Sequence, residues 1–196
     1  MADLTPDAAL RHLVGWGLVG GPTEPLALGS QPGLGSLAEF HQVPGVVLAA
    51  VDGGAVTDID PTLVDDLTAR HLRLLHRTLA VEADLVVVAR RLAETGVDIR
   101  VLKGGATAHL DYADPALRIT SDVDLLVRDE DLDVATEAVA DLVDRGATVP
   151  DRRAWWTERY GKDRTLTLRS GGELDLHRMT APGFHGLVEH HDWFAD

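Results

Sequence analysis

The most informative stretch of the sequence is Ser121-Asp122-Val123-Asp124-Leu125-Leu126-Val127, which places two acids around one apolar residue at the start of an apolar run. A compact run of leucines and β-branched residues predicts a strand. Side chains at i and i+2 of a strand share a face, so Asp122 and Asp124 point the same way while Val123 and Leu125 face the core. Two like charges held this close repel each other unless a cation lies between them. A divalent metal ion is the natural cation here.

A second acidic stretch, Glu173-Leu174-Asp175-Leu176-His177, repeats the alternation of polar and apolar residues. It follows Thr165 to Arg169 after Ser170-Gly171-Gly172, which is a hairpin signal. If this strand lies beside the first, its acids complete a cluster of three carboxylates. Such a cluster suits Mg²⁺ or Mn²⁺ and leaves positions for phosphate oxygens and water, as two-metal phosphoryl chemistry requires.

The third informative piece is Lys103-Gly104-Gly105, at a predicted junction between a strand and a helix. Glycines there let backbone N–H groups approach a phosphate, and the N-terminus of the following helix favours negative charge. The order of residues is not that of a Walker motif. A tight turn with a surface lysine is the alternative interpretation of this piece, just as a solvated strand end is the alternative for an isolated Asp-x-Asp triplet.

The rest of the chain is interpreted outward from these pieces. Leucines and valines spaced mostly three to five residues apart predict a helix over 61–94, as one helix or two, with Asp60-Pro61 at its start and Gly96 at its end. Further expected elements are a strand over 99–102, a helix over 106–112, a strand over 123–127 and a helix over 129–144, which with the hairpin predict a mixed sheet. Residues 20–35 are expected to form a loop, and 46–51 form either a strand or a buried helical turn.

Composition limits the classes of function. The chain has 196 residues, a formal charge of −14 and no cysteine, so disulfides and thiolate metal sites are excluded. The acidic balance disfavours long nucleic acid but is compatible with a nucleoside triphosphate that is held locally. The absence of a signal peptide and of a long apolar run predicts a cytoplasmic protein without a membrane partner. A mostly helical region with a Gly/Pro-rich linker over 1–95 and a catalytic core over 96–196 are expected.

Together, the three pieces resemble the nucleotidyltransferase fold of the DNA polymerase beta superfamily, specifically its small, poorly characterised bacterial nucleotidyltransferase family. The resemblance covers roughly the second half of the chain and includes Tyr112 and Asp114-Pro115 leading to Arg118. It implies an α/β (α+β) fold with a mixed sheet flanked by helices. It also implies transfer of a nucleoside monophosphate from a triphosphate, ATP among the candidates, to a hydroxyl of a small-molecule or protein acceptor.

The resemblance also implies roles for individual residues. Asp122 and Asp124 would bind both metal ions, and Asp175 would bind one and help deprotonate the acceptor hydroxyl. Gly104 and Gly105 would hold the triphosphate, with Lys103 and Arg118 neutralising phosphate charge. His177 shares the strand face of Asp175 and would touch the metal site or the acceptor.

Two rival functions stay open from the sequence. A non-catalytic module on the same fold would bind nucleotide or a partner without turnover, and a metal-dependent phosphohydrolase would release nucleoside monophosphate without modifying an acceptor. A basic and aromatic patch around Trp155 and Trp156 could stack a base, although a helix covering the sheet is the favoured interpretation. Histidines 185, 190 and 191 lack a spacing that predicts a metal site.

Overall fold

The chain folds into two units of closely contacting residues. A computed structural model describes residues 4–144, 146, 161–179 and 193–194. The N-terminal unit comprises Met1–Arg77 and Asp111–Ile119, and the C-terminal unit comprises Thr78–Leu110 and Thr120–Asp196. The expected division of the chain into 1–95 and 96–196 stays a prediction, which limited proteolysis would test. None of the described helices is long and apolar enough to cross a membrane.

The N-terminal unit is mostly helical, with one small sheet. Its helices and strands are α1 (Pro6–Gly15), β1 (Leu26–Gly29), α2 (Leu34–Phe40), α3 (Pro44–Asp52), β2 (Val56–Ile59), the first half of α4 and the 3₁₀ turn η1 (Pro115–Leu117). Strands β1 and β2 pair in parallel. Their apolar residues share a core with the fully buried Leu13, Leu34 and Val47. The alternatives left open for 46–51 resolve as helix α3, and the loop expected over 20–35 contains β1.

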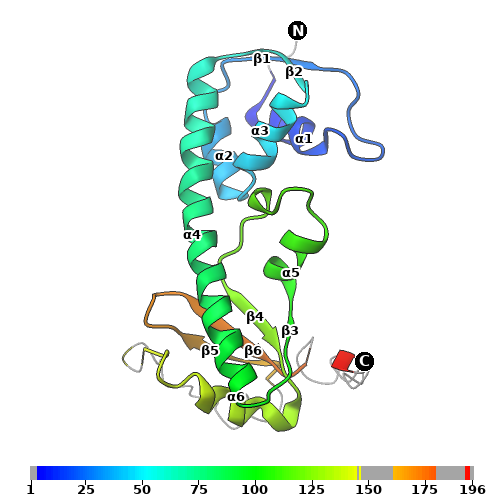
Figure 1. The fold of residues 1–196 in the computed structure, drawn as a ribbon. Coiled ribbons are helices and arrows are strands. Elements are labelled where there is room, and N and C mark those ends of the chain that lie inside the picture. Colours follow the sequence, from blue (N-terminus) through cyan, green and yellow to red (C-terminus); the bar gives the residue numbers. More distant parts are fainter. Residues whose placement is uncertain (1–3, 145, 147–160, 180–192, 195–196) are drawn as a thin grey trace. The chain divides into compact units, whose positions relative to one another are not determined.

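Helix α4 (Pro61–Glu94) is continuous and extends from one unit into the other, coloured from cyan to green in Figure 1. Asp60 accepts a hydrogen bond at its start from the backbone N–H of Thr62 at 2.9 Å. This bond holds the pKa of the Asp60 carboxyl below its ordinary value. Gly96, with φ of 77°, ends the helical segment in the left-handed conformation that glycine adopts at low cost. The predicted helix over 61–94 is confirmed, as a single helix.

In the described part of the C-terminal unit, four strands form a mixed sheet in the order β3-β4-β6-β5. Its further elements are β3 (Arg100–Val101), α5 (Lys103–Leu110), β4 (Val123–Leu126), the 3₁₀ turn η2 (Asp129–Asp131), α6 (Leu132–Ala138), β5 (Asp163–Thr167) and β6 (Glu173–His177). Strand β4 is antiparallel to β3 and parallel to β6, and β5 is antiparallel to β6. The predicted mixed sheet and the 165–177 hairpin are confirmed.

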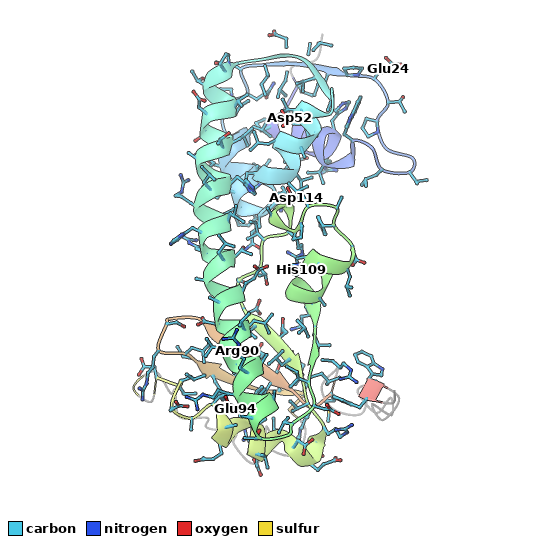
Figure 2. The ribbon with its side chains drawn as sticks, viewed as in Figure 1. Glu24, Asp52, Arg90, Glu94, His109 and Asp114 are labelled. Atoms are coloured by element: carbon cyan, nitrogen blue, oxygen red, sulfur yellow. The ribbon has the colours of Figure 1, made fainter. Side chains whose placement is uncertain are left out.

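The two faces of this sheet have different chemistry. Val123 and Leu125 of β4, with Leu174 and Leu176 of β6, belong to a core that also includes Val88 of α4 and residues of α6. The C-terminal half of α4 therefore covers one face, where Arg90 and Glu94, labelled in Figure 2, keep to the exposed side of the helix. The alternate residues of β4 and β6 point to the opposite face, which carries the acids.

Two predicted helices in this unit have wrong boundaries. Helix α5 starts at Lys103, so Lys103-Gly104-Gly105 forms its first turn and is not a separate turn before residue 106. The helix expected over 129–144 ends at Ala138. After this helix, the backbone of residues 142–144 forms hydrogen bonds with the end of β5 and the residues that follow it. Asp144 N donates to Thr167 O and Arg169 N donates to Leu142 O, both at 2.8 Å. These bonds replace those of a longer helix.

Candidate active site

The carboxylates of β4 and β6 lie side by side because the two strands pair in parallel register. Asp124 is directly opposite Asp175, and both are buried, with exposed fractions of 4% and 9%. Among the described residues, two groups of ligand atoms form on this face, with all atoms of a group within 4.8 Å of one another. One group is Asp124, Asp175 and His177, and the other is Asp122, Glu173 and Asp175. The groups share Asp175, so the acids predicted from the sequence lie in one place.

Asp124 is the most heavily bonded of these acids. Its Oδ1 lies 2.5 Å from Lys103 Nζ and 2.7 Å from His177 Nε2. A carboxylate that is removed from water is stable only when it is paired and hydrogen-bonded. Lys103 and His177 therefore hold the Asp124 carboxylate in its buried position.

Lys103 reaches Asp124 because of the backbone that precedes it. Leu102 N donates to Asp124 O at 3.0 Å, which ties the start of α5 to β4. Lys103 itself has φ of 44°, a left-handed conformation that costs a non-glycine residue about 1 to 2 kcal/mol. Such strain is concentrated at functional sites, where the surroundings hold it in place.

The electrostatic environment keeps Lys103 charged. Partial burial acts to lower the pKa of its ammonium group, but the hydrogen bond to Asp124 and the charges of Asp124, Asp175 and Asp122 outweigh burial and raise the pKa. The same charges attract any cation that enters the site. The local field therefore favours metal ions and the metal-bound form of a nucleotide.

Strand β5 provides a second row of side chains behind the acids. Thr165 pairs with Asp175 and donates from Oγ1 to Asp175 Oδ1 at 2.5 Å. Asp163 pairs with His177, and its Oδ2 lies 3.6 Å from His177 Nδ1, too far for a hydrogen bond. Asp163 and Thr165 were not among the residues predicted for the site. The available signal was the alternation Thr165-Leu166-Thr167, which places Asp163 on the same strand face as the two threonines.

Helix α4 supports the segment that leads into Asp122. Thr78 and Thr120 are both buried, and Thr120 N donates to Thr78 Oγ1 at 3.2 Å while Thr78 Oγ1 donates to Thr120 O at 3.3 Å. Thr120 Oγ1 in turn lies 3.4 Å from Asp122 O. The long helix therefore fixes the backbone on which the first acid is placed.

The two glycines of α5 are packed tightly. A Cβ atom on Gly104 would lie 2.4 Å from Thr120 Oγ1, and one on Gly105 would lie 3.1 Å from Val101 Cγ1. Glycine at both positions thus lets the helix approach β3 and the Thr120 segment closely. Backbone N–H groups in the first turn of a helix have no partner within the helix, so this turn can also donate to an anion.

Substitution of Gly104 separates packing from helix propensity. We expect Gly104→Ala to destabilise the fold by about 1 to 3 kcal/mol, because the added methyl group overpacks a buried contact with Thr120. Gly105→Ala is the comparison variant: it brings the same gain in helix propensity of about 1 kcal/mol, but its contact with Val101 Cγ1 at 3.1 Å requires a smaller adjustment, so we expect a smaller loss. Urea unfolding of both proteins measures the difference, and equal stabilities would contradict the steric argument.

One further predicted residue belongs to the other unit, and several are not described. Arg118 belongs to the N-terminal unit, where its guanidinium donates to the carbonyl oxygen of Ile119. Trp155, Trp156 and the histidines at 185, 190 and 191 lie outside the described residues.

The residues at the site fit a divalent metal ion by their chemistry. Carboxylate oxygens are the ligands of Mg²⁺ and Mn²⁺, and imidazole is a ligand of transition metals. Both groups offer three ligand atoms and leave positions for water or substrate oxygens. The buried acids and His177 can therefore hold a divalent metal.

The sheet and its acids define the class of protein, an α/β nucleotidyltransferase fold with clustered carboxylates on one face. A family model described as uncharacterised nucleotidyltransferase matches residues 31–193, which is well over half of the chain. The chain belongs to this nucleotidyltransferase family. Comparisons with curated proteins and with solved structures found no match.

Proposed function

We propose that this protein transfers a nucleoside monophosphate from a nucleoside triphosphate to a hydroxyl group of a small-molecule or protein acceptor. The observation that carries the proposal is the juxtaposition of Asp124 and Asp175 on paired strands, with Asp122 and Glu173 beside them. Family membership supports the same reaction class. In this reaction the acceptor oxygen forms a bond to the α-phosphorus, the bond to the bridging oxygen of the β-phosphate breaks, and pyrophosphate leaves.

The acids of the site would bind the metal ions and accept the proton of the acceptor. Divalent metal ions, Mg²⁺ or Mn²⁺, held by Asp122, Asp124 and Asp175 would neutralise charge on the α-phosphate and on the leaving pyrophosphate. Asp175 would accept the proton of the acceptor hydroxyl, because Thr165 bonds one of its oxygens and leaves the other available.

Helix α5 is the proposed support for the triphosphate. Its first turn, with Gly104 and Gly105, would donate backbone N–H groups to phosphate oxygens. The Lys103 ammonium, which is half-exposed and kept charged by the acids, would pair with a phosphate once the nucleotide arrives. Arg118 is proposed as a second cation for the triphosphate.

Binding and turnover of each nucleoside triphosphate test the proposal. We expect calorimetric titration to show binding that requires Mg²⁺ or Mn²⁺ and is lost in Asp122→Asn, a position that is only partly buried and so leaves the fold intact. With candidate acceptors present, we expect pyrophosphate release and an acceptor mass increased by one nucleoside monophosphate. Circular dichroism of the variant verifies that it is folded.

Each other outcome identifies a rival function. Metal-dependent binding without pyrophosphate release would indicate the non-catalytic nucleotide-binding module. Release of nucleoside monophosphate without acceptor modification would indicate a phosphohydrolase. Absence of binding by the folded wild-type protein would overturn the nucleotide site and favour a partner-binding module.

A further inference from the structure

His177 is a buried imidazole at the centre of the acidic face, and the proposed transfer reaction gives it no task. Its exposed fraction is 1%, the lowest of the buried polar side chains at the site. Its Nε2 faces Asp124 Oδ1 at 2.7 Å. With Asp124 and Asp175 it forms the one ligand group among the described residues that contains a nitrogen atom.

The position between Asp124 and His177 already attracts a cation. Lys103 Nζ lies 2.5 Å from Asp124 Oδ1 and 3.4 Å from His177 Nε2, so an ammonium group is held against both ligand atoms. The Lys103 side chain is 52% exposed, which leaves room for it to move away. A metal ion that replaced the ammonium group, with the ring proton moved from Nε2 to Nδ1, would meet one carboxylate oxygen and one imidazole nitrogen at once.

The other nitrogen of His177 faces a second carboxylate. Asp163 Oδ2 lies 3.6 Å from Nδ1, opposite His177 in the β5–β6 register, and Lys162 Nζ pairs with the same oxygen at 2.6 Å. Histidines that bind metals commonly donate their second N–H to a carboxylate, which sets the tautomer and the orientation of the ring. Asp163 is the carboxylate that faces Nδ1, and an approach of the two groups on metal binding would complete this pattern, since at 3.6 Å they are not hydrogen-bonded.

The second ligand group differs in its chemistry. Asp122, Glu173 and Asp175 offer oxygen atoms alone, and Asp122 and Glu173 are more exposed than the residues of the first group. Mg²⁺ prefers oxygen ligands and retains several waters, whereas imidazole suits first-row transition metals. The two groups therefore favour different ions.

We propose that Asp124, Asp175 and His177 form a mixed oxygen and nitrogen site that selects a first-row divalent transition metal over Mg²⁺, with Asp163 as the positioning residue for His177. The oxygen-only group of Asp122, Glu173 and Asp175 then takes Mg²⁺. This inference deepens the proposed function and rests on it, because it assigns the metal preference of the same site.

The test uses the full chain, freed of metal by chelation, without nucleotide and with Mn²⁺ as the probe. We expect pulsed electron paramagnetic resonance to detect a nitrogen coupled to the bound Mn²⁺, and the coupling to change to that of ¹⁵N when only histidine is ¹⁵N-labelled. We expect His177→Gln to abolish this coupling and to lower the preference for Mn²⁺ over Mg²⁺ by about 10- to 100-fold, the size of loss common for changes around a metal site.

Two further variants separate the ligand from its support. Asp163→Asn should keep the nitrogen coupling but weaken Mn²⁺ binding by about 10-fold, since it removes the carboxylate proposed to accept from the Nδ1–H of the metal-bound ring. Thr167→Val is the matched control on the same face of β5, opposite Glu173, and should leave Mn²⁺ binding unchanged.

Mn²⁺ bound to the wild-type protein without histidine nitrogen coupling would overturn the inference, whether or not His177→Gln folds. An unchanged metal preference in a folded His177→Gln protein would overturn it as well. The proposed function fails separately: histidine coupling in a protein that releases no pyrophosphate would leave the metal site and remove the transfer reaction. Transfer activity in a protein whose bound Mn²⁺ shows no histidine nitrogen coupling would support the proposed function and overturn the mixed oxygen and nitrogen site.

Discussion

Replacement of Asp124 by Asn is expected to lower nucleotidyl transfer by about 10²- to 10³-fold or more, the size of loss that follows removal of one preorganised electrostatic group. Asp124 belongs to the buried metal-ligand group and accepts from both Lys103 and His177. An amide keeps the shape of the side chain but removes its charge and one acceptor oxygen. Single-turnover measurement of pyrophosphate release at saturating Mg²⁺ and nucleotide gives the effect on the chemical step.

A surface carboxylate provides the control for this charge change. Asp98→Asn removes one negative charge from an exposed side chain that pairs with Arg128 at 3.2 Å and belongs to neither ligand group. We expect its transfer rate to match that of the wild-type protein. Comparable rates in Asp124→Asn and Asp98→Asn would show that the reaction does not use this site.

Replacement of Lys103 by Met is expected to have opposite effects on the metal-free and the metal-bound protein. Without metal, the buried Asp124 carboxylate loses a charged donor, and we expect a loss of about 1 to 3 kcal/mol in the free energy of unfolding. The absence of a competing ammonium group should in turn increase the affinity for Mn²⁺. Urea unfolding with and without the ion measures both effects.

The stability lost on replacing Lys103 by Met is expected to depend on pH in one direction. Interactions with the acids raise the pKa of Lys103 above its ordinary 10.5, so the folded state binds the proton more tightly than the unfolded state. The contribution of Lys103 to the free energy of unfolding is therefore fully present below the pKa of lysine in the unfolded state. It disappears as the pH rises through the pKa of Lys103 in the folded state. We expect the difference between wild type and Lys103→Met to stay constant between about pH 7 and 9 and to shrink only above the ordinary lysine pKa.

Lys103→Arg is the matched variant for the metal-free protein. It keeps the positive charge, so we expect it to recover part of the lost stability, although the planar guanidinium donates with a different geometry. If Met and Arg destabilise the metal-free protein equally, the charge of Lys103 is not what stabilises Asp124. Transfer activity should fall in both, because the ammonium group is proposed to bind phosphate.

Long regular elements were predictable from local pattern. The helix over 61–94 matched α4 because its apolar spacing, its Asp60-Pro61 start and its Gly96 end are all local features. Residues 129–144 carried a similar spacing, but bonds to Thr167 and Arg169 shorten that helix to α6. The parallel pair β1 and β2 was missed because each strand has only four residues and pairs over a long sequence separation.

The acids at the site were predictable from the sequence for a comparable reason. In Asp122-Val123-Asp124 and Glu173-Leu174-Asp175 the alternation of a strand determines which residues share a face, and apolar neighbours direct the acids away from the core. Alternation does not reveal which strand lies beside which. It therefore left open how the two acidic stretches would meet.

Tertiary structure alone decided the partners of these acids. Parallel pairing of β4 with β6 places Asp124 opposite Asp175, and the hairpin places Asp163 and Thr165 opposite His177 and Asp175. The bond from Leu102 N to Asp124 O brings Lys103, 21 residues away in the sequence, against Asp124. Local sequence was sufficient to predict which side chains share a face of each strand, because alternation is a property of local backbone geometry. Strand order and register depend on burying the shared apolar face of the sheet. Which charged side chains become neighbours is therefore set only when the strands pair in the folded protein.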